Sequence, residues 1–109
     1  MSRVALGEFE HHVMLALLRL GGRAHGPPVV AELEQATGKP VSPASVFIAL
    51  RRLEQRGLTR SKKHEPRPGE GGRGKRVFEL TVSGHSRLRD ARRTLEKLWG
   101  PGKPAAEIR

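Results

Sequence analysis

The sequence predicts a mainly α-helical chain with one small β-hairpin, and three observations lead to this fold class. Apolar residues recur at helical spacing in four separate segments. Two short stretches with β-propensity, residues 58–63 and 77–80, flank a loop rich in Gly and Pro between the third and fourth segments. The length of 109 residues is that of one domain, with a small core.

The composition excludes several classes of protein. The chain has no Cys, which excludes disulfides, thiol catalysis and cysteine-ligated zinc. No stretch approaches the roughly 20 apolar residues needed to cross a bilayer, and no signal peptide is visible. We therefore expect a cytoplasmic protein with no membrane partner. Carboxylate pairs, nucleophile–base sets and metal-ligand spacings are missing from the sequence, so we expect neither an enzyme nor a bound cofactor or metal.

Residues 6–20 predict the first helix. Its apolar stripe consists of Leu6, Phe9, Val13, Leu17 and Leu20. Met14 and Leu18 widen this stripe beyond what a single core requires, and such a helix is either central or shared between subunits. His11 and His12 are neighbours in this helix, and neighbouring side chains point about 100° apart, which disfavours joint binding of one metal ion.

The next two segments predict a helix-turn-helix pair. Gly21-Gly22 ends the first helix, and a short second helix passes through residues 29–36 and stops at residues 37–40. Ser42 is expected to cap the third helix, and Gly57 is expected to end it in a left-handed conformation. The connection between the helices is short, so we expect them to lie next to each other.

The third helix is amphipathic. Val46, Leu50 and Leu53 form its core stripe. The opposite side carries Ser45, Arg51, Arg52 and Gln55. Small polar residues in the first turn with arginines further along suit the major groove of DNA, although a solvated surface helix has the same pattern.

Charge distinguishes between these two interpretations. Residues 1–50 carry no net charge, with four basic and four acidic residues, whereas residues 51–76 hold ten basic and three acidic residues, a net charge of +7. The whole chain has a net charge of +10. Most of the charge therefore lies on the third helix and the hairpin, as expected for a surface that binds a phosphate backbone.

The loop of the hairpin, residues 64–74, is rich in Gly, Pro and Arg. A nucleotide-binding loop is excluded because Gly74-Lys75 is followed by Arg76 and a strand, where a Ser or Thr and a helix are needed. A basic wing that reaches the DNA backbone or the minor groove fits better.

Thr81 is expected to cap the last helix. The apolar stripe of this helix consists of Leu88, Ala91, Leu95 and Leu98, with Trp99 beside them. The core of the preceding domain is already served by other residues, so this stripe predicts pairing with helices of a second copy. We expect a DNA-binding domain over residues 1–80, a dimerisation helix over residues 81–99 and a disordered tail over residues 100–109.

Three short motifs, in the order in which they occur along the chain, resemble those of a known family. The run from Val41 to Leu58 resembles the recognition helix of PadR-type winged helix-turn-helix regulators, and the run from Glu79 to Gly84 resembles that family's exit from the wing. The opening from Leu6 to Glu10 is similar to that of short members. The resemblance covers roughly residues 5–99. Two departures are Phe47, where the family usually has Tyr, and His25-Gly26-Pro27, where it often has a Tyr-Gly-Tyr-like turn.

The resemblance implies a winged helix-turn-helix with a C-terminal dimerisation helix. It also implies a homodimeric regulator, of the repressor type, that binds a pseudo-palindromic operator in double-stranded DNA. On the recognition helix, the expected DNA contacts are Ser42, Pro43, Ala44, Ser45, Phe47, Arg51, Arg52 and Arg56. On the wing, they are Lys62, Lys63, Arg67, Arg73, Lys75 and Arg76. The expected dimer interface comprises Leu6, Phe9, Val13, Met14, Leu17, Leu88, Ala91, Leu95, Leu98 and Trp99.

Within these sets, two residues have more than one expected role. Phe47 either contacts a thymine methyl group or packs partly into the core beside Val46. Family members that sense small molecules do so between the subunits, so Trp99 and Met14 predict a hydrophobic small-molecule effector of planar shape. The alternative is that Trp99 completes the dimer core.

Two other functions fit the same sequence. A sequence-neutral architectural protein that binds DNA or RNA would use the same basic surface. A winged helix that binds only proteins would not require the concentration of charge on residues 51–76.

Overall fold

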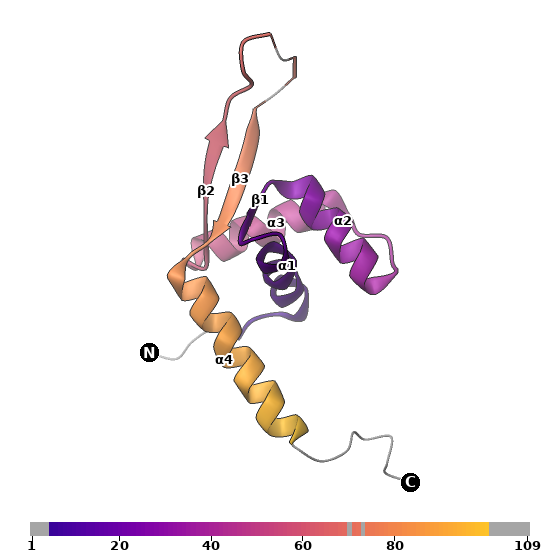
Figure 1. The fold of residues 1–109 in the computed structure, drawn as a ribbon, viewed down its shortest axis with the longest axis vertical. Coiled ribbons are helices and arrows are strands. Elements are labelled where there is room, and N and C mark those ends of the chain that lie inside the picture. The colour runs from indigo at the N-terminus through magenta and orange to yellow at the C-terminus, as the bar shows by residue number, and fades with distance from the viewer. Residues whose placement is uncertain (1–4, 70, 73, 101–109) are drawn as a thin grey trace.

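The computed structural model of the chain describes residues 5–69, 71, 72 and 74–100. Within them, the elements in order are α1 (Glu8–Arg19), β1 (Arg23–Ala24), α2 (Gly26–Thr37), α3 (Pro43–Gln55), β2 (Thr59–His64), β3 (Lys75–Leu80) and α4 (Val82–Trp99). The first three helices form a body from which the β2–β3 wing and α4 project in opposite directions (Figure 1). The predicted fold class, mainly α-helical with a β-hairpin wing, is confirmed.

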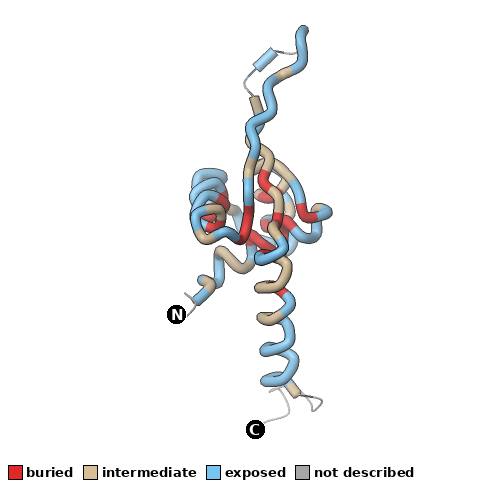
Figure 2. Tube along the Cα trace, turned by 90° about the vertical axis from the view of Figure 1, so that its left-hand side faces the viewer, coloured by how far each residue is buried: buried red, intermediate tan, exposed pale blue. Residues whose placement is uncertain are grey.

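The core lies where α1, α2 and α3 meet the base of the sheet. Its fully buried apolar side chains are Val13, Met14, Leu17, Val29, Val46, Leu50, Leu53 and Phe78. Burying each such side chain stabilises the fold by about 1.5–3 kcal/mol. Figure 2 shows the buried positions gathered in the body, whereas the wing tip and the last turns of α4 are exposed.

Two hydroxyl side chains cap the N-termini of α3 and α4, as predicted. The Ser42 hydroxyl accepts a hydrogen bond from the Ser45 N–H at 3.2 Å, which caps α3. The Thr81 hydroxyl accepts from the Gly84 N–H at 3.0 Å, which caps α4, and it donates to the Gly57 carbonyl at 2.7 Å. Gly57 follows α3 with a φ of 76°, a conformation that favours glycine. The end of α3 and the start of α4 are therefore joined.

The sheet contains one strand more than the predicted hairpin. Its order is β1-β3-β2 with both pairs antiparallel, and Arg23 and Ala24 of β1 pair with Glu79 and Phe78 of β3. The Leu80 N–H extends this pairing by donating to the Gly22 carbonyl at 2.9 Å. The segment after α1 is thereby fixed to the wing instead of forming only a loop.

Helix α4 starts against the body and then leaves it. Gly84 is buried, and a side chain at this position would collide with the Leu58 carbonyl, so α4 approaches the backbone as closely as glycine allows. Leu88, one turn later, is buried as well, whereas Leu98 is 80% exposed. Of the predicted tail over residues 100–109, all but Gly100 lies outside the described residues.

Within the part of the chain that the structure describes, no helix is long and apolar enough to cross a membrane.

Candidate nucleic-acid interface

The first turn of α3 presents small side chains to solvent. Ser42, Pro43, Ala44 and Ser45 are all exposed. Because these side chains are small and exposed, the backbone of this turn can approach another surface closely. An exposed N-terminal turn of a helix with small polar side chains has the shape and chemistry needed to reach base edges in a major groove.

Phe47 combines the two roles that the sequence allows. Its ring is 46% exposed. It also packs edge-on against the buried Phe78, with ring centroids 5.9 Å apart and an interplanar angle of 82°. The inner edge of Phe47 therefore stabilises the junction of α3 with the sheet, and the outer part remains available to a ligand.

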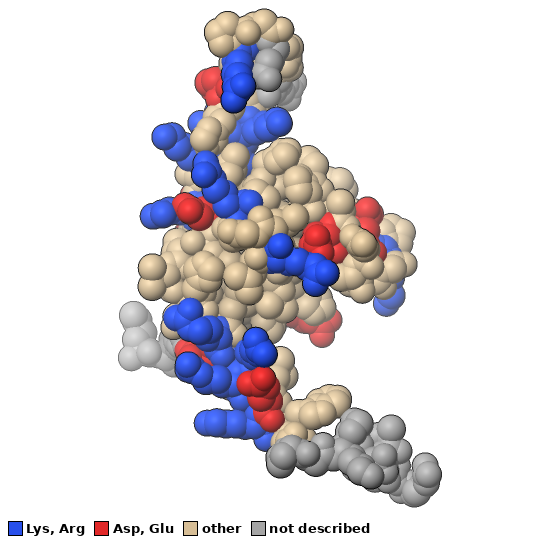
Figure 3. All heavy atoms as spheres, viewed as in Figure 1, with Lys and Arg blue, Asp and Glu red and all other residues tan. Residues whose placement is uncertain are grey.

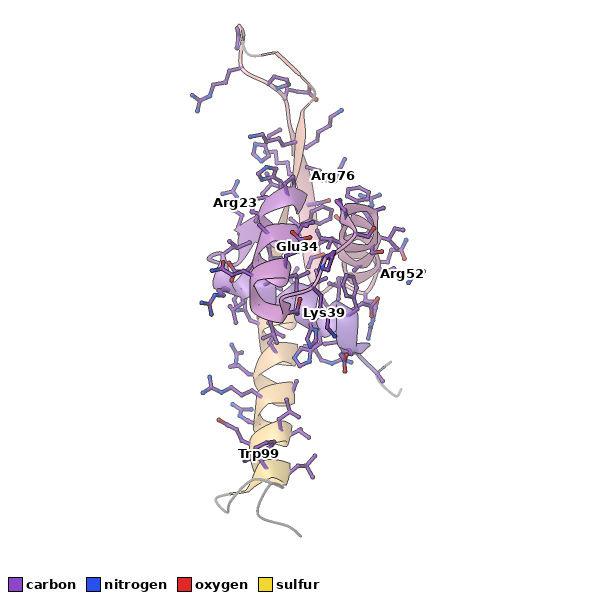
Figure 4. The ribbon with its side chains drawn as sticks, turned by 90° about the vertical axis from the view of Figure 1, so that its right-hand side faces the viewer. Arg23, Glu34, Lys39, Arg52, Arg76 and Trp99 are labelled. Atoms are coloured by element: carbon purple, nitrogen blue, oxygen red, sulfur yellow. The ribbon has the colours of Figure 1, made fainter. Side chains whose placement is uncertain are left out.

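The three arginines at the end of α3 differ in their surroundings. Arg51 and Arg52 are exposed, and Figure 4 shows Arg52 pointing away from the body. Arg56 is half-buried, and its guanidinium lies 3.2 Å from the Glu10 carboxylate of α1. Arg56 thus ties the end of α3 to the start of α1, whereas Arg51 and Arg52 lie on the solvent-facing side.

The wing carries a second group of cations. Lys62, Lys63, Arg67 and Lys75 are exposed, and Arg76 is half-buried. Lys and Arg side chains line the visible face of the wing in Figure 3, while several acidic side chains lie over α2. Arg73, which was also predicted to bind DNA, lies outside the described residues.

A hydrogen-bonded network that the sequence pattern did not predict joins α3 to the wing. Glu54 of α3 accepts hydrogen bonds at Oε2 from the N–H (2.9 Å) and the hydroxyl (2.8 Å) of Ser61 in β2. The Ser61 hydroxyl in turn accepts from Arg76 Nη1 at 3.0 Å. The other carboxylate oxygen, Oε1, lies 3.3 Å from Arg51 Nη1. The network therefore includes one predicted DNA contact from the helix and one from the wing.

A carboxylate also fixes the turn between the two helices of the helix-turn-helix pair. Glu34 Oε2 accepts a hydrogen bond from the Val41 N–H at 2.9 Å. The next residue, Ser42, is the cap of α3. Glu34 therefore sets where α3 begins, and the sequence offered no periodic signal for this role.

His11 of α1 is half-buried. Burial, together with the charge of the adjacent His12, lowers the pKa of His11 below its ordinary value. His11 lines a groove of about 560 Å³ between the start of α1 and α4. Among the described residues, no cluster of His, Cys, Asp or Glu could hold a metal ion.

The side chains predicted at a dimer interface fall into two sets. Val13, Met14, Leu17 and Leu88 are buried within their own chain. Leu6 and Ala91 are half-buried. The exposed members are Phe9 (39%), Leu95 (59%), Leu98 (80%) and Trp99 (68%).

The structure does not bring the two predicted effector-binding residues together within one chain. Met14 is fully buried in the core. Trp99 lies at the far end of α4, well away from the body (Figure 4). Of these two side chains, only that of Trp99 is accessible to a ligand.

Comparisons with known proteins agree with this fold. Residues 14–90 match the family model described as the transcriptional regulator PadR-like family. A search of curated protein sequences finds no match.

Solved structures share the fold over most of the chain. F93 from STIV, a winged-helix DNA-binding protein, superposes with a TM-score of 0.67 at 14% identity over 91% of this chain and 100% of that chain. A PadR family transcriptional regulator from Eggerthella lenta DSM 2243 superposes with a TM-score of 0.62 at 29% identity, over 79% of this chain and 72% of that chain. Bacillus subtilis PadR, in complex with operator DNA, has a TM-score of 0.62 at 21% identity, and the match covers 77% of this chain and 46% of that chain.

Proposed function

Because this chain belongs to the transcriptional regulator PadR-like family, we propose that it is a homodimeric repressor that binds a specific operator in double-stranded DNA. The observation that carries the proposal is the surface formed by the exposed first turn of α3 and the adjoining basic wing. The family is one of transcriptional regulators, which is not a class of enzymes. The protein would act in the cytoplasm, where chromosomal DNA is accessible.

Specific contacts would come from the first turns of α3. Ser42 to Ser45 would lie nearest the base edges, and the exposed edge of Phe47 would contact a thymine methyl group. Arg51 and Arg52 would bind phosphates on either side of the groove. Arg56 already pairs with Glu10, which favours a supporting role for it over a direct contact. The cations of the wing would add affinity that depends little on sequence.

Dimerisation would use the exposed part of the apolar stripes. Leu95, Leu98 and Trp99 lie on the projecting half of α4, and Phe9 lies on α1. Covering these side chains with a second copy would remove them from water at no cost to the core of either protomer. A two-fold dimer would place its recognition helices about 34 Å apart and would read a pseudo-palindrome. Bacillus subtilis PadR, which has the same fold, forms a complex with operator DNA, and this supports the proposal that the present chain binds operator DNA.

Selection of duplexes from a randomised library, followed by footprinting upstream of the protein's own gene, tests the proposal. We expect one pseudo-palindromic sequence to be enriched and protected. In a double variant, Arg51→Ala with Arg52→Ala, operator affinity should fall. The slope of log affinity against log salt should also decrease, by about one unit for each phosphate that is no longer neutralised.

The matched control is Arg19→Ala, because Arg19 of α1 pairs with Glu32 of α2 and lies on neither α3 nor the wing. This variant should keep the affinity and the salt slope of the unmodified chain. A double variant that binds as tightly as the unmodified chain would show that the wrong side of α3 was assigned to DNA.

The second candidate function is a sequence-neutral architectural protein that binds DNA or RNA. The observation that favours it is the number of exposed cations on the wing, which need not contact bases. The affinity for the operator relative to a mixed-sequence duplex separates the two, since specific regulators prefer their site by about 10³-fold or more. A ratio near one would support the architectural function.

We also propose control by a planar hydrophobic small molecule that binds at Trp99. This side chain is 68% exposed and is the only Trp in the chain, so its fluorescence reports on one location. Saturable quenching by a planar aromatic compound should occur at the concentrations that release operator DNA. Quenching without DNA release would assign Trp99 to the dimer core alone.

A further inference from the structure

Glu54 is the acidic residue at the junction of α3 with the wing. Its two carboxylate oxygens have different partners: Oε1 faces Arg51 on the same helix, and Oε2 accepts both hydrogen bonds from Ser61 of β2. Through the Ser61 hydroxyl the contact continues to Arg76 of β3. Residues 51, 54, 61 and 76 thus form one chain of contacts from the recognition helix to the returning strand of the wing.

The ion pair with Arg51 does not by itself account for an acid at this position. The Glu54 side chain is 29% exposed and that of Arg51 is 48% exposed, and ion pairs this accessible contribute little to folding because water screens them. Glu54 is also one of only three acids among residues 51–76. A negative charge within a phosphate-binding surface weakens the attraction to DNA. The presence of Glu54 in this surface is therefore better explained by the side chains that it holds in place.

We propose that Glu54 is a positioning residue that sets DNA specificity by holding the recognition helix and the wing in one arrangement. The inference rests on the proposed operator binding and adds to it a residue that need not touch DNA. In the free protein the network restrains two long arginine side chains that would otherwise sample many rotamers. Because less freedom is then lost on binding, correct contacts from helix and wing form together.

Replacement of Glu54 by Gln gives effects of opposite sign on the two kinds of binding. Loss of the charge should raise affinity for a mixed-sequence duplex about twofold, since one repulsive charge near the phosphates is gone. Loss of the ordered network should lower affinity for the selected operator about fivefold, because a charge-assisted contact between helix and wing is weakened. The ratio of the two affinities should therefore fall about tenfold.

Glu79→Gln is the matched control. Glu79 makes the same kind of ion pair, with Arg60 at 2.9 Å. It belongs to the same wing, but it lies on the opposite face of the sheet from Ser61 and Phe78, which pair with each other in register. Its replacement should raise both affinities equally and leave the ratio unchanged. If Glu54→Gln also leaves the ratio unchanged, Glu54 acts only as a local charge and the proposal is overturned.

Ser61→Ala tests the same network without changing charge. It removes the hydroxyl between Glu54 and Arg76, so operator affinity should fall while mixed-sequence affinity stays constant. An unchanged ratio in this variant would contradict the proposal even if Glu54→Gln were poorly folded.

Amide hydrogen exchange of Ser61 in the protein without DNA separates a failure of this inference from a failure of the proposed function. Glu54→Gln should accelerate exchange at Ser61 by about tenfold, because a neutral amide oxygen accepts less strongly than a carboxylate. Glu79→Gln should not. Unchanged exchange in Glu54→Gln would overturn the positioning role. An unmodified chain that prefers no operator would overturn the proposed function and with it the effect on specificity, and accelerated exchange in Glu54→Gln would then still show that Glu54 holds the helix to the wing.

Discussion

Helices α3 and α4 are built alike but are covered differently. Each begins at a hydroxyl cap and carries an apolar stripe along one side. The stripe of α3 is covered along its whole length by its own chain, since Val46, Ala49, Leu50 and Leu53 are all buried. That of α4 is covered only as far as Leu88. Helix α3 therefore completes the core of the protomer, whereas the outer half of α4 would need a second chain to cover it.

The largest loss of stability is expected from a substitution in the buried stripe of α3. Leu50→Ala would leave a cavity in the core, and we expect the free energy of unfolding to fall by about 2–5 kcal/mol in urea denaturation. Ile48→Ala on the same helix is the matched control, since Ile48 is 49% exposed. Its change should stay below about 1 kcal/mol. Equal losses in the two variants would contradict the burial pattern of α3.

On the exposed half of α4, a charged substitution should dissociate the proposed dimer without unfolding its protomers. Leu95 is 59% exposed in the protomer, so Leu95→Asp should raise the dimer dissociation constant about 100-fold by burying an unpaired carboxylate at the interface. Sedimentation equilibrium measures the dissociation, and circular dichroism should show unchanged helix content. Lys97→Asp, about 200° further around the helix, is the control. A stable monomer of the unmodified chain would remove the proposed role of α4.

The first turn of α4 passes close to the backbone of the body at Gly84. A methyl group there would meet the Leu58 carbonyl, so Gly84→Ala should lower the free energy of unfolding by about 1–3 kcal/mol. Gly26→Ala offers a control because an added Cβ at Gly26 meets nothing within 4 Å. Thermal unfolding of the two variants side by side checks the prediction. If Gly84→Ala is as stable as Gly26→Ala, α4 does not depend on this close approach.

The smallest effect concerns the groove where α4 passes α1. Because the pKa of His11 is lowered in the folded chain, the unfolded chain binds the proton more readily. Stability should therefore fall slightly as the pH drops below about 6.5. His11→Gln should reduce this pH dependence in urea titrations. The same pH dependence in this variant and in the unmodified chain would show that His11 does not contribute to it.

Local chemistry made much of the fold predictable. Ser42, Thr81 and Gly57 act on residues a few positions away, so their capping and terminating roles could be inferred from sequence. Strand β1 could not, because two residues carry no periodicity and Arg23–Ala24 pair only where β3 comes alongside. The apolar stripe of α4 was visible, but sequence spacing does not say where a covering surface ends.

The candidate site also contains some features that could be predicted from the sequence and others that could not. The exposure of Arg51 and Arg52 follows from the period of α3. Arg56 was expected to join them, yet it pairs with Glu10, 46 residues away in sequence. The Glu54 network likewise depends on residues that lie close together only after folding.

The double role of Thr81 gives α4 a mechanical property. Its hydroxyl holds the carbonyl of Gly57 just after α3 and the first turn of α4 at the same time, so the two helices are joined at one residue. With 18 residues, α4 is about 27 Å long, and a tilt of about 5° relative to α3 would move its tip by about 2 Å. In a dimer joined at the tips, small changes in packing there would alter the spacing of the two recognition helices and hence their fit to successive grooves.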